Sequence, residues 1–515
     1  MAAKNKTGLV LAGLLLGILL AAMDNTIVAT AMGTVVSDLG GFDQFVWVTS
    51  AYMVAFMAGT PIFGKLSDMY GRKRFFIAGL VLFMLGSALC GTAHSMIQLS
   101  LYRALQGIGG GAILPIAFTI IVDIFAPEKR GKVFGLFGAA FGIASICGPL
   151  AGAFLTEVMN WRWVFYINLP LGMVSLVLIL FAYRESLEHS KQRIDWLGAV
   201  TLVGAVVSLM FALELGGNEY AWDSALILIL FAAFAVLLGL FLYAERKAAE
   251  PIISYAMFKN RLFATSNLAA FFTGITFIAA TVYIPIFVQG VLGGSATNSG
   301  LILAPMMLGS VIGSQLGGLL VAKTSYRNIM LCSTACVLAG IVLLGLLTPD
   351  TPRSVVILDM TVTGFGVGFS FSVLSMAAIH HIDFRQRGSA TSTNRFINSL
   401  GTTLGITAFG IIQRSLFSNR MTELGGAAIG QSGELGNTAS RMLTPGSRSE
   451  VPEETLHSIV EALSSSITHT FMWALIPAVL AAISVLLMSN ERMTTLPSTS
   501  PDPSQEGEGC ENNHR

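Results

Sequence analysis

Windows of about twenty predominantly apolar residues recur along the whole chain, and they limit its possible fold more than any other feature. Such a window is what an α-helix needs to cross the hydrocarbon core of a bilayer, which is about 30 Å thick. Fourteen windows can be read from the sequence. They lie at about 9–33, 46–66, 75–95, 98–122, 132–156, 163–183, 196–216, 223–243, 262–290, 297–322, 329–348, 354–380, 389–417 and 467–489. We therefore expect an all-α membrane protein with fourteen transmembrane helices.

The composition agrees with a membrane protein. Of the 515 residues, 54% are hydrophobic and 11% are charged, and the mean hydropathy is +0.71. Soluble domains carry about 25% charged residues. The net charge of +1 gives no sign of a nucleic-acid partner. The first apolar window is longer than a signal-peptide core, so we expect an uncleaved first helix.

Lysine and arginine residues predict the orientation. If the N-terminus is cytoplasmic, the segments on the inner side hold 22 of the 30 basic residues and the outer segments hold six. Basic residues concentrate on the cytoplasmic side of membrane proteins. Because the number of helices is even, both termini are expected in the cytoplasm.

Two segments are too polar to lie in the membrane. The first, 418–466, is expected to form an outer loop in which Pro452 to Leu463 could be a short surface helix. The second, the tail 491–515, is rich in Pro, Ser and Glu and is expected to be a disordered cytoplasmic segment. Cys332 and Cys336 have no second pair of ligands nearby in the sequence, so we expect no metal site.

An internal repeat relates the two ends of the chain. The run QGIGGG at 106–111 precedes EKRG at 128–131, and TGFGVG at 363–368 precedes RQRG at 385–388. At this offset Gly107 matches Gly364, and Arg130 matches Arg387. The fourth and fifth predicted helices thus recur as the twelfth and thirteenth in the same orientation. Parallel halves of this kind occur in transporters that bind their substrate between the halves near the bilayer midplane.

Five motifs identify a family resemblance. They are GKLSDMYGRKR at 64–74, YRALQGIGGG at 102–111, GAAFGIASICGPLAG at 138–152, MDNTIVATAM at 23–32 and WRWVFYINLPLG at 161–172. The first resembles the loop signature of the major facilitator superfamily, and the third is similar to the motif of its exporters. With fourteen predicted helices, the chain resembles the drug:proton antiporters of this superfamily, especially bacterial multidrug-resistance exporters. The second half departs from the loop signature, because AKTSYRN at 322–328 has no matching Asp or Gly.

The resemblance implies an architecture and a function. We expect six-helix bundles at 1–190 and 251–490 with an inserted helix pair at 191–250. The implied function is proton-coupled export of diverse amphipathic or cationic drugs from the cytoplasm by alternating access, in a bacterial inner membrane. Protons, small drug-like molecules and lipid would be the partners of a monomer that needs no cofactor.

Other functions remain open at this stage. A dedicated exporter of one metabolite or antibiotic would have the same fold, and nutrient uptake is the less favoured transport direction. A membrane enzyme or receptor is disfavoured because no catalytic set appears at recognisable spacing. ATP is disfavoured as the energy source because the chain has no Walker-type phosphate loop.

The loop signature predicts a latch between the halves on the cytoplasmic side. Its members are Gly64, Asp68, Gly71, Arg72 and Arg130. An anion at the C-terminal end of a helix needs a compensating partner. Arg72, Arg130 or the N-terminus of the thirteenth helix could neutralise Asp68, and the alternative is a solvated loop.

The fifth predicted helix carries two pairs of glycines around a proline, namely Gly138, Gly142, Gly148, Pro149 and Gly152. Small residues four apart let helices approach closely, and proline weakens the helical ladder. We expect this helix to provide a tightly packed surface that moves during transport.

Charged residues inside membrane helices are the default functional candidates. Asp24 and Arg103 are predicted to lie at similar depth, so Asp24 could bind and release a proton with Arg103 as its switchable partner. A static pair is the alternative. Asp359 is a second candidate for proton binding, and Arg395 is expected either to pair with an acid or to reach toward the inner surface.

The remaining candidates are less specific. Gln106, Phe137 and Phe141 are chosen as residues of the substrate pocket, because they lie beside the glycine motifs. Asp123 is expected to contribute only surface electrostatics. His380, which occupies the matching place in the repeat, and His381 could respond to pH, or could simply end their helix.

Overall fold

The computed structural model describes residues 6–40, 45–185, 195–217, 219–248, 250–294, 296–423 and 453–492. These residues are almost entirely helical. The long helices are α1 (Thr7–Leu39), α2 (Phe45–Tyr70), α3 (Arg72–Gly91), α4 (Met96–Ile124), α5 (Pro127–Val158), α7 (Asn168–Ala182), α8 (Trp196–Leu215), α9 (Ala225–Lys247), α11 (Arg261–Ile286), α12 (Ala296–Leu320), α13 (Tyr326–Gly345), α14 (Arg353–Ala378), α15 (Arg387–Glu423) and α17 (Glu453–Leu486). Shorter pieces are α6 (Trp163–Tyr166), α10 (Tyr255–Phe258), the π-helical turn η2 (Phe287–Val291) and the 3₁₀ turn η3 (Phe384–Gln386).

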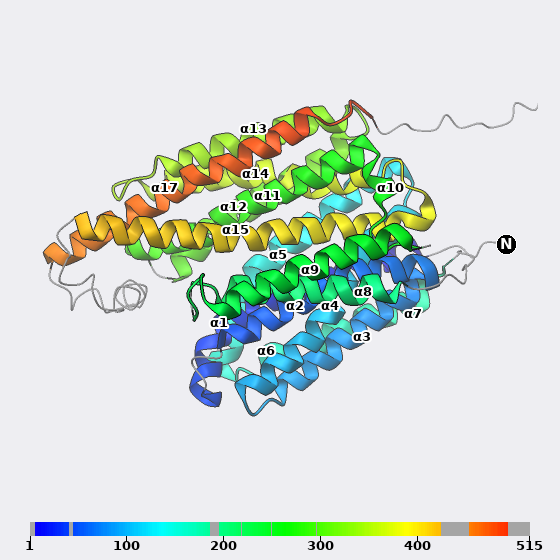
Figure 1. Cartoon of the computed structure of the whole chain (residues 1–515), viewed down its shortest axis with the longest axis horizontal. Coiled ribbons are helices and arrows are strands. Elements are labelled where there is room, and N and C mark those ends of the chain that lie inside the picture. The colour runs from blue at the N-terminus through cyan, green and yellow to red at the C-terminus, as the bar shows by residue number, and fades with distance from the viewer. Residues whose placement is uncertain are drawn as a thin grey trace, which may run out of the picture.

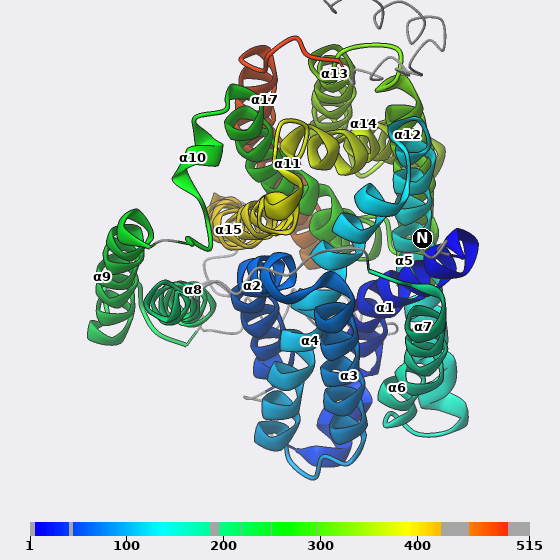
Figure 2. The same cartoon turned by 90° about the vertical axis from the view of Figure 1, so that its right-hand side faces the viewer.

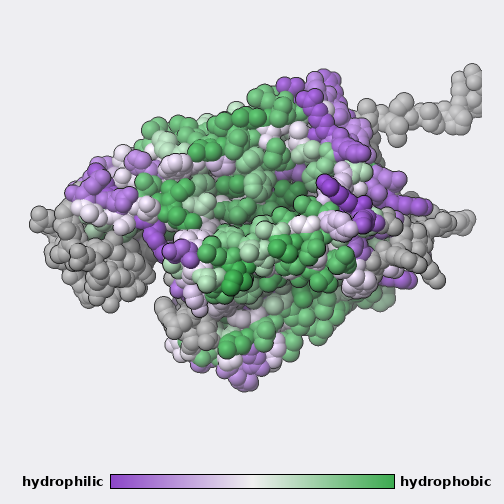
Figure 3. Space-filling model, viewed as in Figure 1, coloured by the Kyte–Doolittle hydropathy of each residue, from purple (hydrophilic) through white to green (hydrophobic). Residues whose placement is uncertain are grey.

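The helices form a membrane-spanning bundle. Thirteen helical segments of the described chain are long and apolar enough to cross a bilayer, and α2, with 26 residues, is the fourteenth long helix. Helices suit this environment because they satisfy their backbone hydrogen bonds internally. Figure 3 shows a broad hydrophobic band between hydrophilic ends. The expected all-α membrane fold is confirmed.

The helices gather in two groups with a pair outside them. In Figure 1 and Figure 2 helices α1–α4, α6 and α7 lie in the lower group and α11–α15 and α17 in the upper group, while α5 extends beside α12. Helices α8 and α9 pack on each other at one side, where α8 contacts α2 and α15. A small core that includes Met57, Leu202 and Phe396 joins this pair to the two groups.

Glycines give the two halves the same internal packing. A β-carbon on Gly107 would lie 2.3 Å from the carbonyl oxygen of Tyr52 in α2, and one on Gly109 would lie 2.4 Å from the amide nitrogen of Phe83 in α3. In the second half, a β-carbon on Gly364 would lie 2.0 Å from the carbonyl oxygen of Met306 in α12, and one on Gly366 would lie 2.8 Å from the amide nitrogen of Val337 in α13. Helix α14 therefore sits against α12 and α13 as α4 sits against α2 and α3. The sequence repeat is thus a structural repeat.

The buried cores show which end of the molecule is closed. We call the end that carries Lys6 and Arg492 the terminal face and the opposite end the distal face. Near the terminal face, a single hydrophobic core contains residues of both halves, such as Phe76, Ile120, Leu374 and Ala390. Toward the distal face, each half has a separate core. The halves therefore meet most closely at the terminal face, which the basic residues predict to be cytoplasmic.

The sixth predicted helix, 163–183, matches the membrane-spanning segment Trp163–Ala182, in which the single turn residue Ile167 divides α6 from α7. Two expectations about the polar segment 418–466 need correction. The predicted outer loop 418–466 is shorter, because α15 continues to Glu423 and α17 begins at Glu453. The predicted surface helix is therefore, from Glu453 onward, the beginning of α17 and not a separate helix. At about 1.5 Å per residue, the 34 residues of α17 exceed the membrane thickness. Residues 424–452 and 493–515, which include most of the predicted loop and tail, lie outside the described residues.

Candidate functional site

Asp24 lies at the centre of a buried polar network in the first half. The side chain is fully buried on α1. One carboxylate oxygen accepts a hydrogen bond from Arg103 Nη1 on α4. The other accepts hydrogen bonds from Gln106 Nε2 at 2.8 Å and from Asn168 Nδ2 of α7 at 3.0 Å. Both oxygens are thus satisfied by three donors from two neighbouring helices.

Arg103 is held as firmly as its partner. The same Nη1 also donates to Gln106 Oε1 at 2.8 Å, and Nε donates to the carbonyl oxygen of Val48 at 3.4 Å. The guanidinium lies 4.2 Å from the ring centroid of Tyr52. The Tyr52 hydroxyl is itself buried without a hydrogen-bond partner in the described structure. The structure thus brings together Asp24 and Arg103, as the sequence predicted, and adds Asn168 and Tyr52, which no motif singled out for this site.

Asp359 has very different surroundings. It is 2% exposed on α14. Among the described residues its carboxylate forms no ion pair and no side-chain hydrogen bond, although its backbone carbonyl accepts one from Thr363. Asp24 and Asp359 therefore differ: Asp24 is fully paired, and the Asp359 carboxylate has no partner among the described residues.

Asp68 joins the two halves at the terminal face. Its carboxylate accepts backbone hydrogen bonds from Gly388 at 2.9 Å and from Ser389 at 2.8 Å. These amides belong to the first turn of α15, where backbone N–H groups have no partner within the helix. Arg72 Nη2 donates to the same carboxylate at 3.1 Å. Two of the three partners that the sequence offered for Asp68 are therefore in contact with it.

A second acidic residue extends this contact. Asp123, at the end of α4, is paired with Arg72, and Arg387 Nη1 of α15 lies 3.9 Å from its carboxylate. Asp123 thus lies in the contact between the halves, which its position at the end of a predicted helix did not reveal. Arg130 instead donates from Nε to the carbonyl oxygen of Phe125 at 2.9 Å.

Glycines allow α2 and α15 to approach this closely. A β-carbon on Gly64 would lie 2.1 Å from Ser392 Oγ, and one on Gly388 would lie 2.6 Å from the Asp68 carboxylate. Gly71 has a φ of 112°, a backbone conformation that favours glycine, at the turn from α2 into α3. Substitution of any of these glycines would push the helices apart or strain the turn.

The glycines of α5 face two different helices. Gly138 and Gly142 pack on α12, where their β-carbons would lie 2.9 Å from Ser314 and Val311 side chains. Gly148 and Gly152 pack on α1, where β-carbons would lie 2.0 and 2.1 Å from the hydroxyl oxygens of Thr26 and Thr30. Pro149 lies inside the helix, between the members of the α1-facing pair. Helix α5 thus connects α1, which carries Asp24, to the opposite half.

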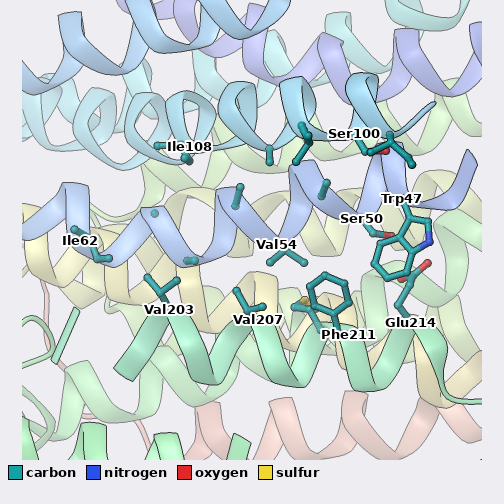
Figure 4. Close-up of a pocket in the computed structure, with 18 of the residues that line it drawn as sticks. Trp47, Ser50, Val54, Ile62, Ser100, Ile108, Val203, Val207, Phe211 and Glu214 are labelled. Carbon is teal, nitrogen blue, oxygen red and sulfur yellow. The ribbon is translucent and has the colours of Figure 1, made fainter. Parts of the chain in front are cut away.

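A cavity of about 780 Å³ lies between α2, α4 and α8. Most of its walls are apolar, and Figure 4 shows Trp47, Ser50 and Glu214 gathered at one end and Ile62 at the other. The Trp47 ring packs on Phe211 with 4.9 Å between ring centroids. Ser50 forms a hydrogen bond with the Glu214 carboxylate. The volume falls in the usual range for drug-sized ligands, about 300–1,000 Å³.

This cavity is accessible from the surface that faces the bilayer. Two of its α4 residues, Ile97 and Leu101, are 61% and 66% exposed. Because α8, which lies outside the two groups, forms one wall, the cavity could not be predicted from the repeat of the two halves.

The three residues predicted to line a substrate pocket lie elsewhere. Gln106 belongs to the Asp24 network. Phe137 packs edge-on against Phe118, with ring centroids 4.7 Å apart, and Phe141 stacks on Phe371 of the other half at 6.5 Å. None of them lines the large cavity, and their role in substrate binding stays a prediction.

One cluster of the described residues has the spacing of metal ligands. The ligand atoms of His380, His381 and Glu491 lie within 4.8 Å of one another near the terminal face. His381 and Glu491 are hydrogen-bonded directly, and His380 Nδ1 lies 3.1 Å from the Tyr326 hydroxyl. Burial and the neighbouring His381 lower the pKa of His380. These contacts link the segment after α17 to the ends of α13 and α14.

Comparisons with known proteins agree with this architecture. The model of the Major Facilitator Superfamily matches residues 14–406. The chain is 56% identical over 496 residues to "Multidrug resistance protein 3" of Bacillus subtilis, covering 95% of this chain and 96% of the relative. It is 39% identical over 420 residues to "Multidrug transporter protein MdtP" of the same organism, covering 82% of this chain and 78% of the relative.

A solved structure shows the same fold. It is a bacterial homologue of the human lysosomal transporter Spinster in an inward-facing, unoccupied conformation, with a TM-score of 0.58 at 18% identity. The alignment covers 96% of this chain and 100% of the other. Together with the family match and the paired six-helix groups, these similarities establish that the chain is a multi-pass membrane protein that belongs to the Major Facilitator Superfamily.

Proposed function

We propose that the protein exports structurally diverse amphipathic drugs, often cationic, in exchange for protons. The observation that carries this proposal is the fully buried Asp24, whose carboxylate is held by Arg103 at the wall of a bundle with two repeated halves. The names of the two Bacillus relatives support drug export. Proton coupling rests on the chemistry of the buried carboxyl groups.

Protonation of Asp24 would weaken the network around it. The Arg103 bond is charge-assisted, and such bonds contribute about 1.5–3 kcal/mol. A neutral carboxyl would lose this contribution and release Arg103 toward its other acceptors, the Gln106 side chain and the Val48 carbonyl. Because α5 packs Gly148 on α1 and Gly138 on α12, a shift of α1 would be transmitted to the opposite half.

Asp359 would be the second proton site. A buried carboxyl group without a partner is less costly to bury neutral than charged. Its surroundings offer no partner among the described residues, so it would carry a proton in the conformation seen here. In this scheme Asp24 and Asp359 give each half one carboxyl group that changes its charge during the cycle.

The cavity between α2, α4 and α8 would receive lipophilic cations from the bilayer. Its apolar walls suit an aromatic or aliphatic body, and Glu214 supplies a negative group at one end. Molecules of this kind concentrate in the membrane, and the exposed Ile97 and Leu101 mark the side from which they would enter.

The direct test is transport in inside-out proteoliposomes with an acidic lumen. Accumulation of ethidium would be compared for wild type, Asp24→Asn and Asp38→Asn. Asp38 is the matched control, because it lies on the same helix but forms a surface ion pair with Arg162. We expect accumulation by wild type and Asp38→Asn, and none by Asp24→Asn or after addition of a protonophore.

Each other result has a clear meaning. Accumulation that persists without a proton gradient would exclude proton coupling. Failure to accumulate any of several lipophilic cations would favour a dedicated exporter of one metabolite.

A further inference from the structure

Arg395 is a half-buried cation that the proposed cycle leaves unexplained. It lies on α15, eight residues after the helix begins at Arg387. The sequence offered two outcomes, an acidic partner or a side chain that reaches the inner surface. The structure instead stacks its guanidinium on Phe118 of the opposite half, with Cζ 4.2 Å from the ring centroid.

No acidic group of the described residues neutralises Arg395. Its Nε is buried without a hydrogen-bond acceptor. Two acids of the terminal face are already engaged. Asp68 contacts Arg72 and the α15 amides, and Asp123 contacts Arg72 and Arg387. A cation–π contact attracts the charge but accepts none of the five N–H donors of a guanidinium. An unpaired arginine at this depth is costly, at about 2.5–3.5 kcal/mol even on insertion scales.

Arg395 also lines a small cavity within the second half, next to its contact with Phe118. Its volume is about 90 Å³, and it is lined by residues of α11, α14 and α15. Asn398 and Thr402 give it polar groups on α15, whereas Phe277 and Phe371 form an aromatic wall. The wall continues into the first half, because the Phe371 ring is stacked parallel to Phe141 at an angle of 8°.

The position of this cavity, close to the contact between the halves, suits the binding of a transported substrate. Helix α15 also provides the latch amides Gly388 and Ser389, so the cavity lies two to three helical turns above the contact that closes the terminal face. Phe118 and Phe141 of the first half contact Arg395 and Phe371, two of the residues that line the cavity. Separation of the halves would remove these contacts and weaken the binding of a ligand there.

We infer that Arg395 and the aromatic wall of Phe371 form a subsite for the carboxylate of an aromatic amphipathic substrate. The planar guanidinium matches a carboxylate with two parallel hydrogen bonds. The cavity holds the charged group, and the aromatic body extends along Phe371 and Phe277. This inference rests on the proposed export function and adds anionic and zwitterionic molecules to its substrates.

The test is equilibrium binding of 1-pyrenebutyrate and of its uncharged methyl ester to the purified full-length protein, measured by fluorescence anisotropy. For wild type we expect the carboxylate to bind about ten- to a hundredfold more tightly than the ester, which is the ratio that a charge-assisted contact supplies. Arg395→Gln should bind both probes equally. Arg395→Lys keeps the positive charge but lacks the planar guanidinium with two parallel N–H donors. Its preference for the carboxylate over the ester should therefore be intermediate.

A second arginine of the same helix is the matched control. Arg420 is paired with Glu423 and Glu461 at the far end of α15, and Arg420→Gln should keep the wild-type ratio. Equal binding of the two probes by wild type would overturn the inference, and so would an undiminished carboxylate preference in Arg395→Gln with unchanged thermal unfolding. Because binding needs no proton gradient, a failure of ethidium transport would count against the proposed function and not against this subsite.

Discussion

Removal of the negative charge at Asp68 should open the terminal face. The side chain is 2% exposed and accepts two backbone hydrogen bonds from α15, which is the contact that crosses between the halves. Hydrogen bonds to a charged group contribute about 1.5–3 kcal/mol each, so the two together contribute about 3–6 kcal/mol. An asparagine oxygen can keep one neutral bond of about 1 kcal/mol.

The expected change in the conformational equilibrium follows from this difference. Water replaces the two hydrogen bonds of Asp68 when the halves separate, so we use the lower limit of about 3 kcal/mol for the aspartate. Subtracting the single bond of about 1 kcal/mol that asparagine keeps leaves a loss of about 2 kcal/mol in the stability of the closed face. At 1.4 kcal/mol per tenfold change, the ratio of open to closed terminal faces should rise about thirtyfold in Asp68→Asn.

Cysteine labelling measures this ratio. Ser392 is fully buried where α15 meets Gly64, so a cysteine at this position becomes accessible only when the terminal face opens. The reporter Ser392→Cys would be placed in a protein whose five native cysteines are replaced. A membrane-impermeant maleimide would then be added from the side of the terminal face.

The control separates the latch from a general loss of stability. Asp38→Asn removes an aspartate from a surface pair with Arg162 that lies within one half, and it should leave the labelling rate unchanged. Equal labelling rates in Asp68→Asn and its parent would refute the latch, because the two bonds to α15 would then contribute nothing to closure.

Three further predictions concern packing, substrate and proton. Gly148→Leu should abolish ethidium transport, because its β-carbon would lie 2.0 Å from a threonine hydroxyl oxygen of α1. The control Gly33→Leu should transport normally at equal expression, because a β-carbon on Gly33 would have no neighbouring atom within 4 Å. Glu214→Gln should raise the KM for ethidium about tenfold, as expected for loss of a partly buried charge contact, and Glu219→Gln outside the cavity should not change it. Asp359→Asn mimics a permanently protonated group, so it should lower the number of protons moved per ethidium, measured by a pH-sensitive dye in the lumen; an unchanged ratio would exclude this residue as a proton carrier.

Much of the architecture could be predicted from the sequence. The number of helices follows from local hydropathy, because each membrane helix satisfies its own backbone and needs only a sufficient apolar length. The repeat of Gly107 and Gly364 predicted parallel halves, and both glycines do pack on the equivalent helix. The pairing of Asp24 with Arg103 could also be anticipated, because few charges lie within the membrane and these two were predicted at similar depth.

Helix ends outside the membrane were less predictable. The extension of α15 to Glu423 and the start of α17 at Glu453 depend on contacts between them, such as the pair of Arg420 with Glu461. Hydropathy carries no signal for a helix that continues into water, so the polar ends were expected to be loop.

The tertiary structure alone decided which distant groups meet. Asp68 and Gly388 are 320 residues apart in the chain, and Asp123 closes the same face. Arg395 stacks on Phe118, with no acidic partner in the part of the chain that the structure describes. The cavity of Glu214 exists only because α8 packs on α2. A sequence window records how apolar each helix is, but the partner of a buried charge depends on how helices cross and on which face of the molecule is closed.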